Sequence, residues 1–203
     1  MNKLVLTFLT FVLLGLGAER NGTLTDSRDG KIYKTLKIGE YNFMMDNLNY
    51  SVDGSSCFRE SEAFCKTYGR AYNYKTAIGE EEAVEWDGVQ GVCPEGWRIP
   101  SAEEWIYLIQ NSGGRLQHKN RSKASVILAK NTFNLKLAGS KSHSSNKYFL
   151  IGKKGYYMTS SMEEGNWVVV DFSKNDKGFE MSVNSDAHKE RAISCRCIQY
   201  SDQ

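Results

Sequence analysis

The stretch Cys93-Pro94-Glu95-Gly96-Trp97-Arg98-Ile99-Pro100-Ser101-Ala102-Glu103-Glu104-Trp105 decides the fold of this chain. Its first half is a turn, because Pro94 and Gly96 interrupt regular structure and Pro100 disfavours helix in the residue before it. A helix start follows. The Ser101 hydroxyl can accept a hydrogen bond from the Glu104 backbone N–H while the Glu104 carboxylate reaches back, which is a capping box. We therefore predict a helix N-cap at Ser101.

The predicted helix runs from about Ala102 to Gln110, and two glycines at 113 and 114 end it. Trp105, Leu108 and Ile109 recur at helical spacing, so one helix face is apolar and packs against the rest of the molecule. We expect both tryptophans of the stretch to lie in the core, since large aromatic side chains at such positions usually pack. The residues assigned to this structural motif are Trp97, Arg98, Pro100, Ser101, Glu104 and Trp105.

The first residues of the chain have the features of a secretory signal peptide. Lys3 supplies a short positive region, residues 4–16 are apolar apart from Thr and Gly, and Ala18 offers a cleavage site. The apolar run is too short for a comfortable membrane span, which needs about 20 residues. We predict a signal peptide over residues 1–18, one domain over residues 19–203 and no membrane span after cleavage. The expected location is secreted or cell envelope, in the periplasm or on the outer surface.

The charge balance argues against a nucleic-acid partner. The chain has 26 Lys and Arg against 24 Asp and Glu, and the basic residues are scattered except around Lys119 to Lys123. Nucleic-acid binding draws its affinity from clustered basic side chains that contact phosphates. We therefore expect no nucleic-acid partner; the partner expected from the function favoured below is a glycan or a surface protein.

Five cysteines in an exported chain predict disulfides with one thiol left over. Cys57 and Cys65 are close enough to bridge their local segment, and Cys93 then pairs with Cys195 or Cys197. The alternative is a metal or redox site, because residues i and i+2 on a strand face the same side and two thiolates can hold a soft ion such as Cu(I). We favour disulfides, because metal sites usually recruit further ligands, and we predict no metal and no cofactor.

The remaining pattern places strands at both ends of the chain and helices between them. Asp29-Gly30 between extended runs is a strong hairpin signal. The segment from Cys57 to Tyr68 is predicted as a second short helix. Later strands are predicted at Tyr148 to Ile151, Gly155 to Ser160, Asn166 to Phe172, Gly178 to Val183 and Ala192 to Gln199. This order predicts an α+β domain with a mixed or antiparallel twisted sheet that joins the N- and C-terminal strands, two short helices and long loops.

Four groups of residues carry a resemblance. They are Asp29-Gly30-Lys31, Asp46-Asn47-Leu48-Asn49-Tyr50, Tyr68-Gly69-Arg70, and the run from Gly91 through the stretch quoted above to Trp105. In this order they resemble the Fibrobacter succinogenes major paralogous domain, over nearly all of residues 19–203. The resemblance implies export and a C-type-lectin-like fold, which is also found in formylglycine-generating enzymes. It further implies that Cys197 pairs with Cys93 and that Cys195 is an extra free thiol, since the family's closing Ser-Val-Arg-Cys corresponds to residues 194–197.

The favoured function is an exported, non-catalytic binding module of the cell surface or secreted fraction, which recognises a glycan or a protein. Sugars stack their apolar face on aromatic rings. The aromatic candidates for ligand contact are Trp86, Tyr148, Tyr156 and Trp167. For Tyr156 and Trp167, packing within the sheet is an equally good interpretation, because both lie in predicted strands. The sugar-binding triplets of calcium-dependent lectins are absent from the sequence.

Two alternative functions come from other classes. A copper oxidase of the formylglycine-generating type, or a relic of one, needs a pair of reactive thiolates, and Cys195 with Cys197 are the candidates. A structural component of the cell envelope needs no small ligand at all. No catalytic residues are assigned, because the sequence has no nucleophile-elbow motif and no His-Glu-x-x-His motif.

Overall fold

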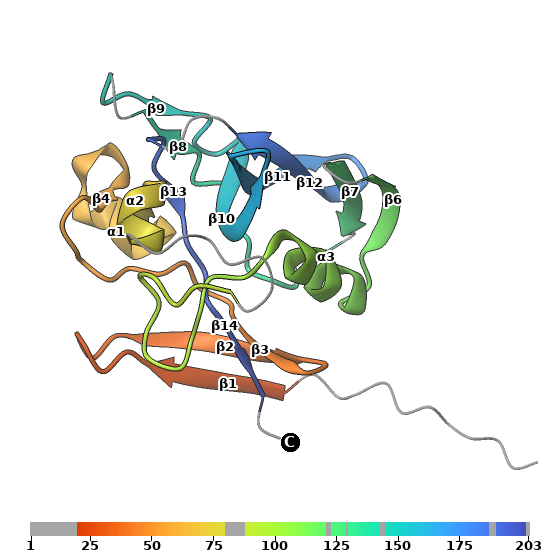
Figure 1. The fold of residues 1–203 in the computed structure, drawn as a ribbon, viewed down its shortest axis with the longest axis horizontal. Coiled ribbons are helices and arrows are strands. Elements are labelled where there is room, and N and C mark those ends of the chain that lie inside the picture. Colours follow the sequence, from red (N-terminus) through yellow and green to blue (C-terminus); the bar gives the residue numbers. More distant parts are fainter. Residues whose placement is uncertain are drawn as a thin grey trace, which may run out of the picture.

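The computed structural model describes residues 20–79, 88–120, 123–128, 130–142, 145–186 and 190–201. Within these ranges the chain forms a four-stranded sheet, an eight-stranded sheet, a small two-stranded sheet and three α-helices (Figure 1). The predicted α+β class is confirmed. The predicted signal peptide, residues 1–18, lies outside the described residues. Among the helices that are described, none is long and apolar enough to cross a bilayer.

A four-stranded antiparallel sheet, which we call the terminal sheet, contains strands from both ends of the chain. Its spatial order is β1 (Arg20–Thr25), β2 (Ile32–Ile38), β3 (Tyr41–Met44) and β14 (Ile198–Tyr200). The predicted hairpin at Asp29-Gly30 is confirmed, since β1 pairs with β2 and Gly30 takes a positive φ of 71°. Because β14 pairs with β3, the prediction that the N- and C-terminal strands share a sheet is confirmed.

The larger, central sheet is mixed. Its spatial order is β4 (Ser56–Cys57), β5 (Arg70–Tyr72), β13 (Ile193–Ser194), β10 (Lys154–Glu163), β11 (Asn166–Asn175), β12 (Gly178–Asp186), β7 (Lys123–Leu128) and β6 (Arg115–Asn120). β10 and β13 run parallel and the other pairs antiparallel. A separate hairpin of β8 (Ser140–Lys141) and β9 (Tyr148–Phe149) lies at the end of the molecule away from the terminal sheet (Figure 1).

The segment from Ala192 to Gln199 is two strands, which corrects the prediction of one. β13 belongs to the central sheet and β14 to the terminal sheet, so the chain crosses between sheets over residues 195–197. The crossing is held by Arg196, whose side chain is fully buried. Its guanidinium donates to Asn47 Oδ1 at 2.8 Å and to the carbonyl oxygens of Phe133 and Asn134 at 2.5 and 2.8 Å. Burial lowers the pKa of Arg196, and these acceptors replace the water it has lost.

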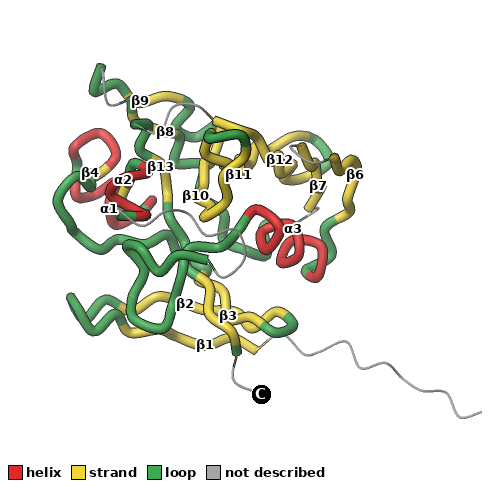
Figure 2. Tube along the Cα trace, in the orientation of Figure 1, coloured by secondary structure: helices red, strands yellow, loops and turns green. Residues whose placement is uncertain are grey.

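Three α-helices are present where two were predicted, namely α1 (Glu62–Tyr68), α2 (Tyr74–Ile78) and α3 (Ala102–Asn111). Figure 2 shows α1 and α2 on one side of the crossing strand β13 and α3 on the other. The predicted helix from Cys57 to Tyr68 is wrong in its first third. Cys57 lies in β4, where it pairs with Arg70 of β5. A short 3-10 turn, η1 (Phe58–Glu60), then precedes α1.

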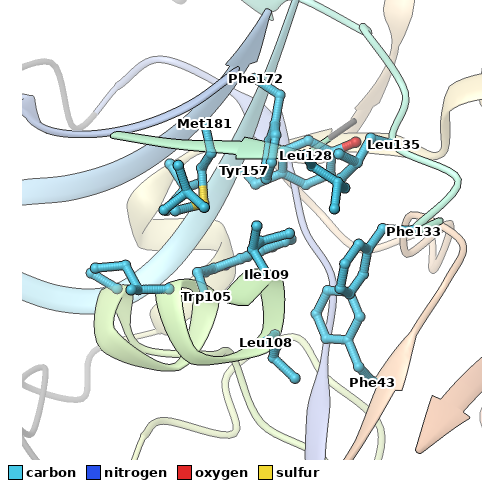
Figure 3. Packing of buried hydrophobic residues seen from close by; sticks show 14 of the residues in the cluster. Phe43, Trp105, Leu108, Ile109, Leu128, Phe133, Leu135, Tyr157, Phe172 and Met181 are labelled. Carbon is cyan, nitrogen blue, oxygen red and sulfur yellow. The ribbon is translucent and has the colours of Figure 1, made fainter. Parts of the chain in front are cut away.

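Helix α3 forms as predicted and covers one face of the central sheet. Ser101 and Glu104 make both bonds of the capping box. Trp105 is fully buried and its indole N–H donates to the Met158 carbonyl oxygen at 3.1 Å. Figure 3 shows its ring between the helix and side chains of the sheet; the centroid distances are 5.0 Å to Phe43 and 5.3 Å to Tyr157. The predicted core position of Trp105 is confirmed.

The opposite face of the central sheet packs against a second core that contains the long-range disulfide. Cys93 is bonded to Cys197 across 104 residues of sequence, and Cys57 is bonded to Cys65. Cys195 is a buried free thiol. Both pairings and the free thiol match the implication of the family resemblance. Trp97 packs in this second core and is buried, as predicted.

Candidate functional site

A small pocket, the Tyr148 pocket, lies where the β8–β9 hairpin meets η1. It encloses about 240 Å³ and is lined by Arg59, Tyr148, Leu150, Ile151 and Lys153. Its wall is apolar along Tyr148, Leu150 and Ile151, and two cationic side chains complete it. Of the three aromatic candidates that the structure describes, Tyr148 is the one that lines this pocket.

Tyr148 is held rigidly. Its hydroxyl donates to Glu60 Oε1 at 2.6 Å and lies 3.1 Å from the Cys57 carbonyl oxygen. The ammonium of Lys141 donates to the same Glu60 oxygen at 2.6 Å. The ring packs on buried Phe58 with a centroid distance of 6.3 Å. Because the hydroxyl and one side of the ring are already held in place, a ligand that contacts the side facing the pocket loses little further side-chain entropy.

The charges around the hydroxyl set the ionisation of this group. Hydrogen bonds from Lys141 and then from Tyr148 lower the pKa of Glu60, so this carboxylate stays ionised at neutral pH. Burial, and then the hydrogen bond to Glu60, raise the pKa of Tyr148. The phenol is therefore neutral and its proton stays in the bond to Glu60.

The backbone of the pocket is strained. Arg59, Glu60 and Leu150 have positive φ angles of 55°, 50° and 59°. In the described ranges six residues other than glycine are left-handed, and these three line or adjoin one pocket. Such a conformation costs an L residue roughly 1–2 kcal/mol, and strained residues cluster at functional sites. The clustering selects this pocket over the other cavities.

The strain is held in place by a local framework. Arg59 and Glu60 lie in the loop that the Cys57–Cys65 disulfide closes. Phe58, in the same loop, is fully buried. Phe58 belongs to a small core with Ala71 of β5 and with Ala138 and Ala192 from the segments before β8 and β13. Buried Phe58 thus anchors this segment to the core, while Arg59 and Glu60 themselves remain exposed.

Two other aromatic candidates do not face a ligand. Trp167 has 0% exposure, its indole N–H donates to the Thr159 carbonyl oxygen at 3.1 Å, and its ring packs on Tyr74. The prediction that Trp167 is displayed to a ligand is wrong, because the packing interpretation holds. Tyr156 is 9% exposed, and the guanidinium of Arg191 lies 4.5 Å from its ring centroid. The fourth candidate, Trp86, lies outside the described residues.

Two further cavities lie along the terminal sheet. The larger, about 800 Å³, is an open groove lined by Asn21, Gly22, Thr23, Lys34, Thr35, Met45 and Asn134. The smaller, about 260 Å³, has Tyr33, Asp46 and several lysines among its lining residues. The larger volume alone does not make the groove the better site, because no aromatic ring lines it.

The cysteines form a structural cluster that does not fit copper chemistry. The sulfurs of Cys93, Cys195 and Cys197 lie within 4.8 Å of one another, but two of them are joined in the disulfide. Burial raises the pKa of the Cys195 thiol to about 12, so it is protonated at neutral pH. A soft-metal site needs thiolates. The pair that the copper hypothesis requires is therefore not available.

Sequence reasoning missed the cationic half of the pocket. Arg59 and Tyr148 are 89 residues apart, and the contact between their segments depends on how β8, β9 and β4 are placed by the fold. The run Tyr148-Phe149-Leu150 followed by Lys153 was visible as an apolar segment next to a cation. Nothing in the sequence near Arg59 indicates its left-handed backbone, because glycine or asparagine would be the usual signal.

The chain was compared with protein families, curated proteins and solved structures. The sequence model of the Fibrobacter succinogenes major domain matches residues 19–199. No curated protein and no solved structure matches the chain. The matched range runs from before β1 into β14, so the Tyr148 pocket lies inside it.

Proposed function

Because this chain belongs to the Fibrobacter succinogenes major domain family, we propose that it is an exported, non-catalytic module that binds glycans at the Tyr148 pocket. We further propose that its fold is C-type-lectin-like. The observation that carries the proposal is a rigid aromatic ring in the wall of a strained, solvent-open pocket. Sugar rings stack on aromatic faces, and a fixed ring binds at a lower entropy cost than a mobile one.

The size of the pocket suits one sugar residue. Pockets for drug-sized ligands enclose about 300–1,000 Å³, and this pocket of about 240 Å³ is smaller. Its apolar wall of Tyr148, Leu150 and Ile151 matches the apolar face of a pyranose, and the cationic rim matches its polar edge. A single ring at the end of a glycan, or one residue of a longer chain, is the occupant we infer.

The placement of the pocket supports a display role. Both ends of the described chain lie in the terminal sheet, and the β8–β9 hairpin lies at the other end of the molecule (Figure 1). This arrangement leaves the end that carries the pocket open to a ligand, away from both ends of the described chain. The pairing of N- and C-terminal strands in one sheet is the feature that supports the C-type-lectin-like assignment.

Export is supported by the covalent chemistry. Two disulfides lie within the described residues, and disulfides persist mainly in oxidising compartments. The predicted signal peptide agrees with that location. The proposed site of action is the cell surface or the secreted fraction.

The test uses residues 19–203 with the disulfides formed. Affinity electrophoresis in gels that contain soluble polysaccharides, and pull-down on insoluble ones, are run with calcium and with chelator. We expect saturable binding that Tyr148→Ala weakens at least tenfold, which corresponds to about 1.4 kcal/mol. Binding that does not change on adding chelator is expected, since the calcium-dependent sugar triplets are absent.

A matched control is Tyr200→Ala. Tyr200 is 56% exposed on β14 in the terminal sheet, and its removal should leave binding unchanged. Equal loss in both variants, or no loss for Tyr148→Ala, contradicts the assignment of the pocket. Absence of binding to every glycan contradicts the glycan function. It would favour a surface-protein partner, for which the exposed Phe149 and Leu150 would provide apolar contact.

A further inference from the structure

Two cations of the Tyr148 pocket have no acidic partner. Arg59 and Lys153 line the pocket and are exposed, and within the part of the chain that the structure describes neither forms an ion pair. The guanidinium of Arg59 lies 5.2 Å from the ring centroid of Phe64, and this cation–π contact restricts the motion of the arginine side chain. Its side chain is exposed, and its five N–H donors are available to a ligand.

The two carboxylates that follow Arg59 in the sequence, Glu60 and Glu62, are already engaged. Glu60 binds the ammonium of Lys141 and the hydroxyl of Tyr148, so its negative charge is offset by one positive charge. Glu62, which begins α1, lies 3.6 Å from Arg70. With these pairs subtracted, the pocket keeps the positive charges of Arg59 and Lys153. Lys147 on the β8–β9 hairpin is exposed and adds to the same field.

The left-handed backbone at Arg59 gives this cation its position. Glycine would adopt φ of 55° without strain, and here an arginine does so at a cost. The burial of Phe58 and the disulfide that closes the segment stabilise this strained backbone conformation. The result is an arginine on a constrained backbone that lines the same pocket as Tyr148 and Leu150, which fits a ligand with an anionic group on an otherwise stackable ring.

We propose that the Tyr148 pocket selects acidic glycans, whose carboxylate or sulfate group is bound by Arg59 and Lys153 while the sugar ring stacks on Tyr148. This inference rests on the proposed glycan function and narrows it to a ligand class. A guanidinium binds a carboxylate or sulfate in a bidentate manner, and Lys153 adds a second charge-assisted bond. A neutral sugar would leave both cations without an anion.

The experiment compares one polymer in two charge states. Binding of residues 19–203 is measured by affinity electrophoresis to polygalacturonate and to its methyl ester, which has the same sugar rings without the charge. We expect the acid form to bind at least tenfold more tightly, and added salt to weaken it by screening. A sulfated polysaccharide in a third arm shows whether carboxylate or sulfate is preferred.

The variants separate a site from general charge attraction. Arg59→Gln and Lys153→Gln each remove one pocket cation and should lower affinity for the acid form about tenfold, with little effect on the ester. Lys177→Gln removes the same charge from the exposed β11–β12 turn and should have no effect. Since all three side chains are exposed, the variants are expected to fold, and circular dichroism checks this.

The outcomes distinguish the two levels of the proposal. Equal binding of acid and ester, with loss in Tyr148→Ala, overturns the acidic selectivity and leaves the glycan function standing. No binding to either polymer or to any neutral glycan overturns both. Equal loss in Lys177→Gln overturns the pocket as the source of selectivity. Tighter binding to vesicles of anionic phospholipid than to the polymer, with the same dependence on Arg59, overturns the glycan assignment in favour of a membrane surface.

Discussion

Helix α3 and the Tyr148 pocket use their residues in opposite ways. At α3, Ser101 caps the helix, the Arg98 guanidinium binds the Glu104 carboxylate, and Trp105 is fully buried. At the pocket, Arg59 is left-handed and unpaired within the described chain, and Leu150 is left-handed and 43% exposed. Both regions contain an arginine next to an aromatic ring, since Arg98 lies 5.0 Å from the ring centroid of Tyr200 and Arg59 lies 5.2 Å from that of Phe64. One arginine completes the fold, and the other is presented to solvent.

The contrast shows where stability and function lie in this molecule. Backbone in preferred conformations, satisfied donors and buried rings stabilise the fold around α3. Strain and uncompensated charge at the pocket lower stability and leave binding groups available. Changes near α3 should therefore alter unfolding, and changes at the pocket should alter binding.

The largest expected effect is removal of the long-range disulfide. In the double variant Cys93→Ala with Cys197→Ala, the unfolded chain regains the freedom of a 104-residue separation, which the chain-entropy model values at about 4–5 kcal/mol. Urea denaturation measures the loss. The folded fraction should keep its glycan affinity, because the pocket lies elsewhere. A smaller loss of stability than on removal of the Cys57–Cys65 disulfide would contradict the contrast between the α3 region and the pocket.

The local disulfide should behave in the reverse manner. Cys57→Ala with Cys65→Ala opens a separation of eight residues, for which the same model gives about 2–3 kcal/mol. Ligand binding should be weakened more than folding stability, because Arg59 and Glu60 lie between these cysteines. Without the disulfide, their left-handed backbone conformation is no longer supported. We expect at least a tenfold loss of glycan affinity at temperatures where the variant is folded. Unchanged affinity would show that the strain is not needed for binding.

The capping box has a smaller, pH-dependent effect. Ser101→Ala should destabilise by about 1 kcal/mol. Burial raises the pKa of Glu104, but hydrogen bonds from Arg98 and from the Ser101 backbone N–H outweigh it, so the pKa lies below the usual range of a glutamate. A carboxylate with a lowered folded pKa stabilises above its unfolded pKa, and this stabilisation is lost as pH falls through the folded pKa.

Glu104→Gln sharpens that test. Wild-type stability should fall relative to the variant as pH drops below about 4.5, and the gap between the two should close in acid. Thermal denaturation over this pH range measures it. A constant gap at all pH values would mean that the ion pair with Arg98 does not stabilise the helix.

The smallest expected effect is at Cys195. Replacing this buried thiol by valine keeps an apolar group of similar size and should change stability by about 1 kcal/mol or less. Thiol titration of the wild type should find no reactive thiol in the folded protein and one after unfolding. The variant should show none in either state. Rapid labelling of the folded wild type would place Cys195 in a reactive role.

Sequence reasoning succeeded where the structure is determined locally. The cap at Ser101 and the Asp29-Gly30 turn depend on residues three or fewer positions apart, so their signals are complete in the sequence. For Trp167 the sequence left ligand contact and sheet packing open, because an alternating pattern cannot show that both faces of β11 are covered over most of its length. Arg59 was missed because the pocket that it lines exists only once the fold has brought Tyr148, 89 residues away, beside it.

The central claim is that the Tyr148 pocket is where an acidic glycan binds. The most direct measurement is a titration of isotopically labelled residues 19–203 with an oligogalacturonate, followed by the backbone amide signals in NMR spectra. The account predicts that the largest shifts fall on residues 58–60 and 148–153, with α3 and the terminal sheet unchanged. Shifts centred on the terminal sheet, or spread evenly over exposed lysines, would contradict it.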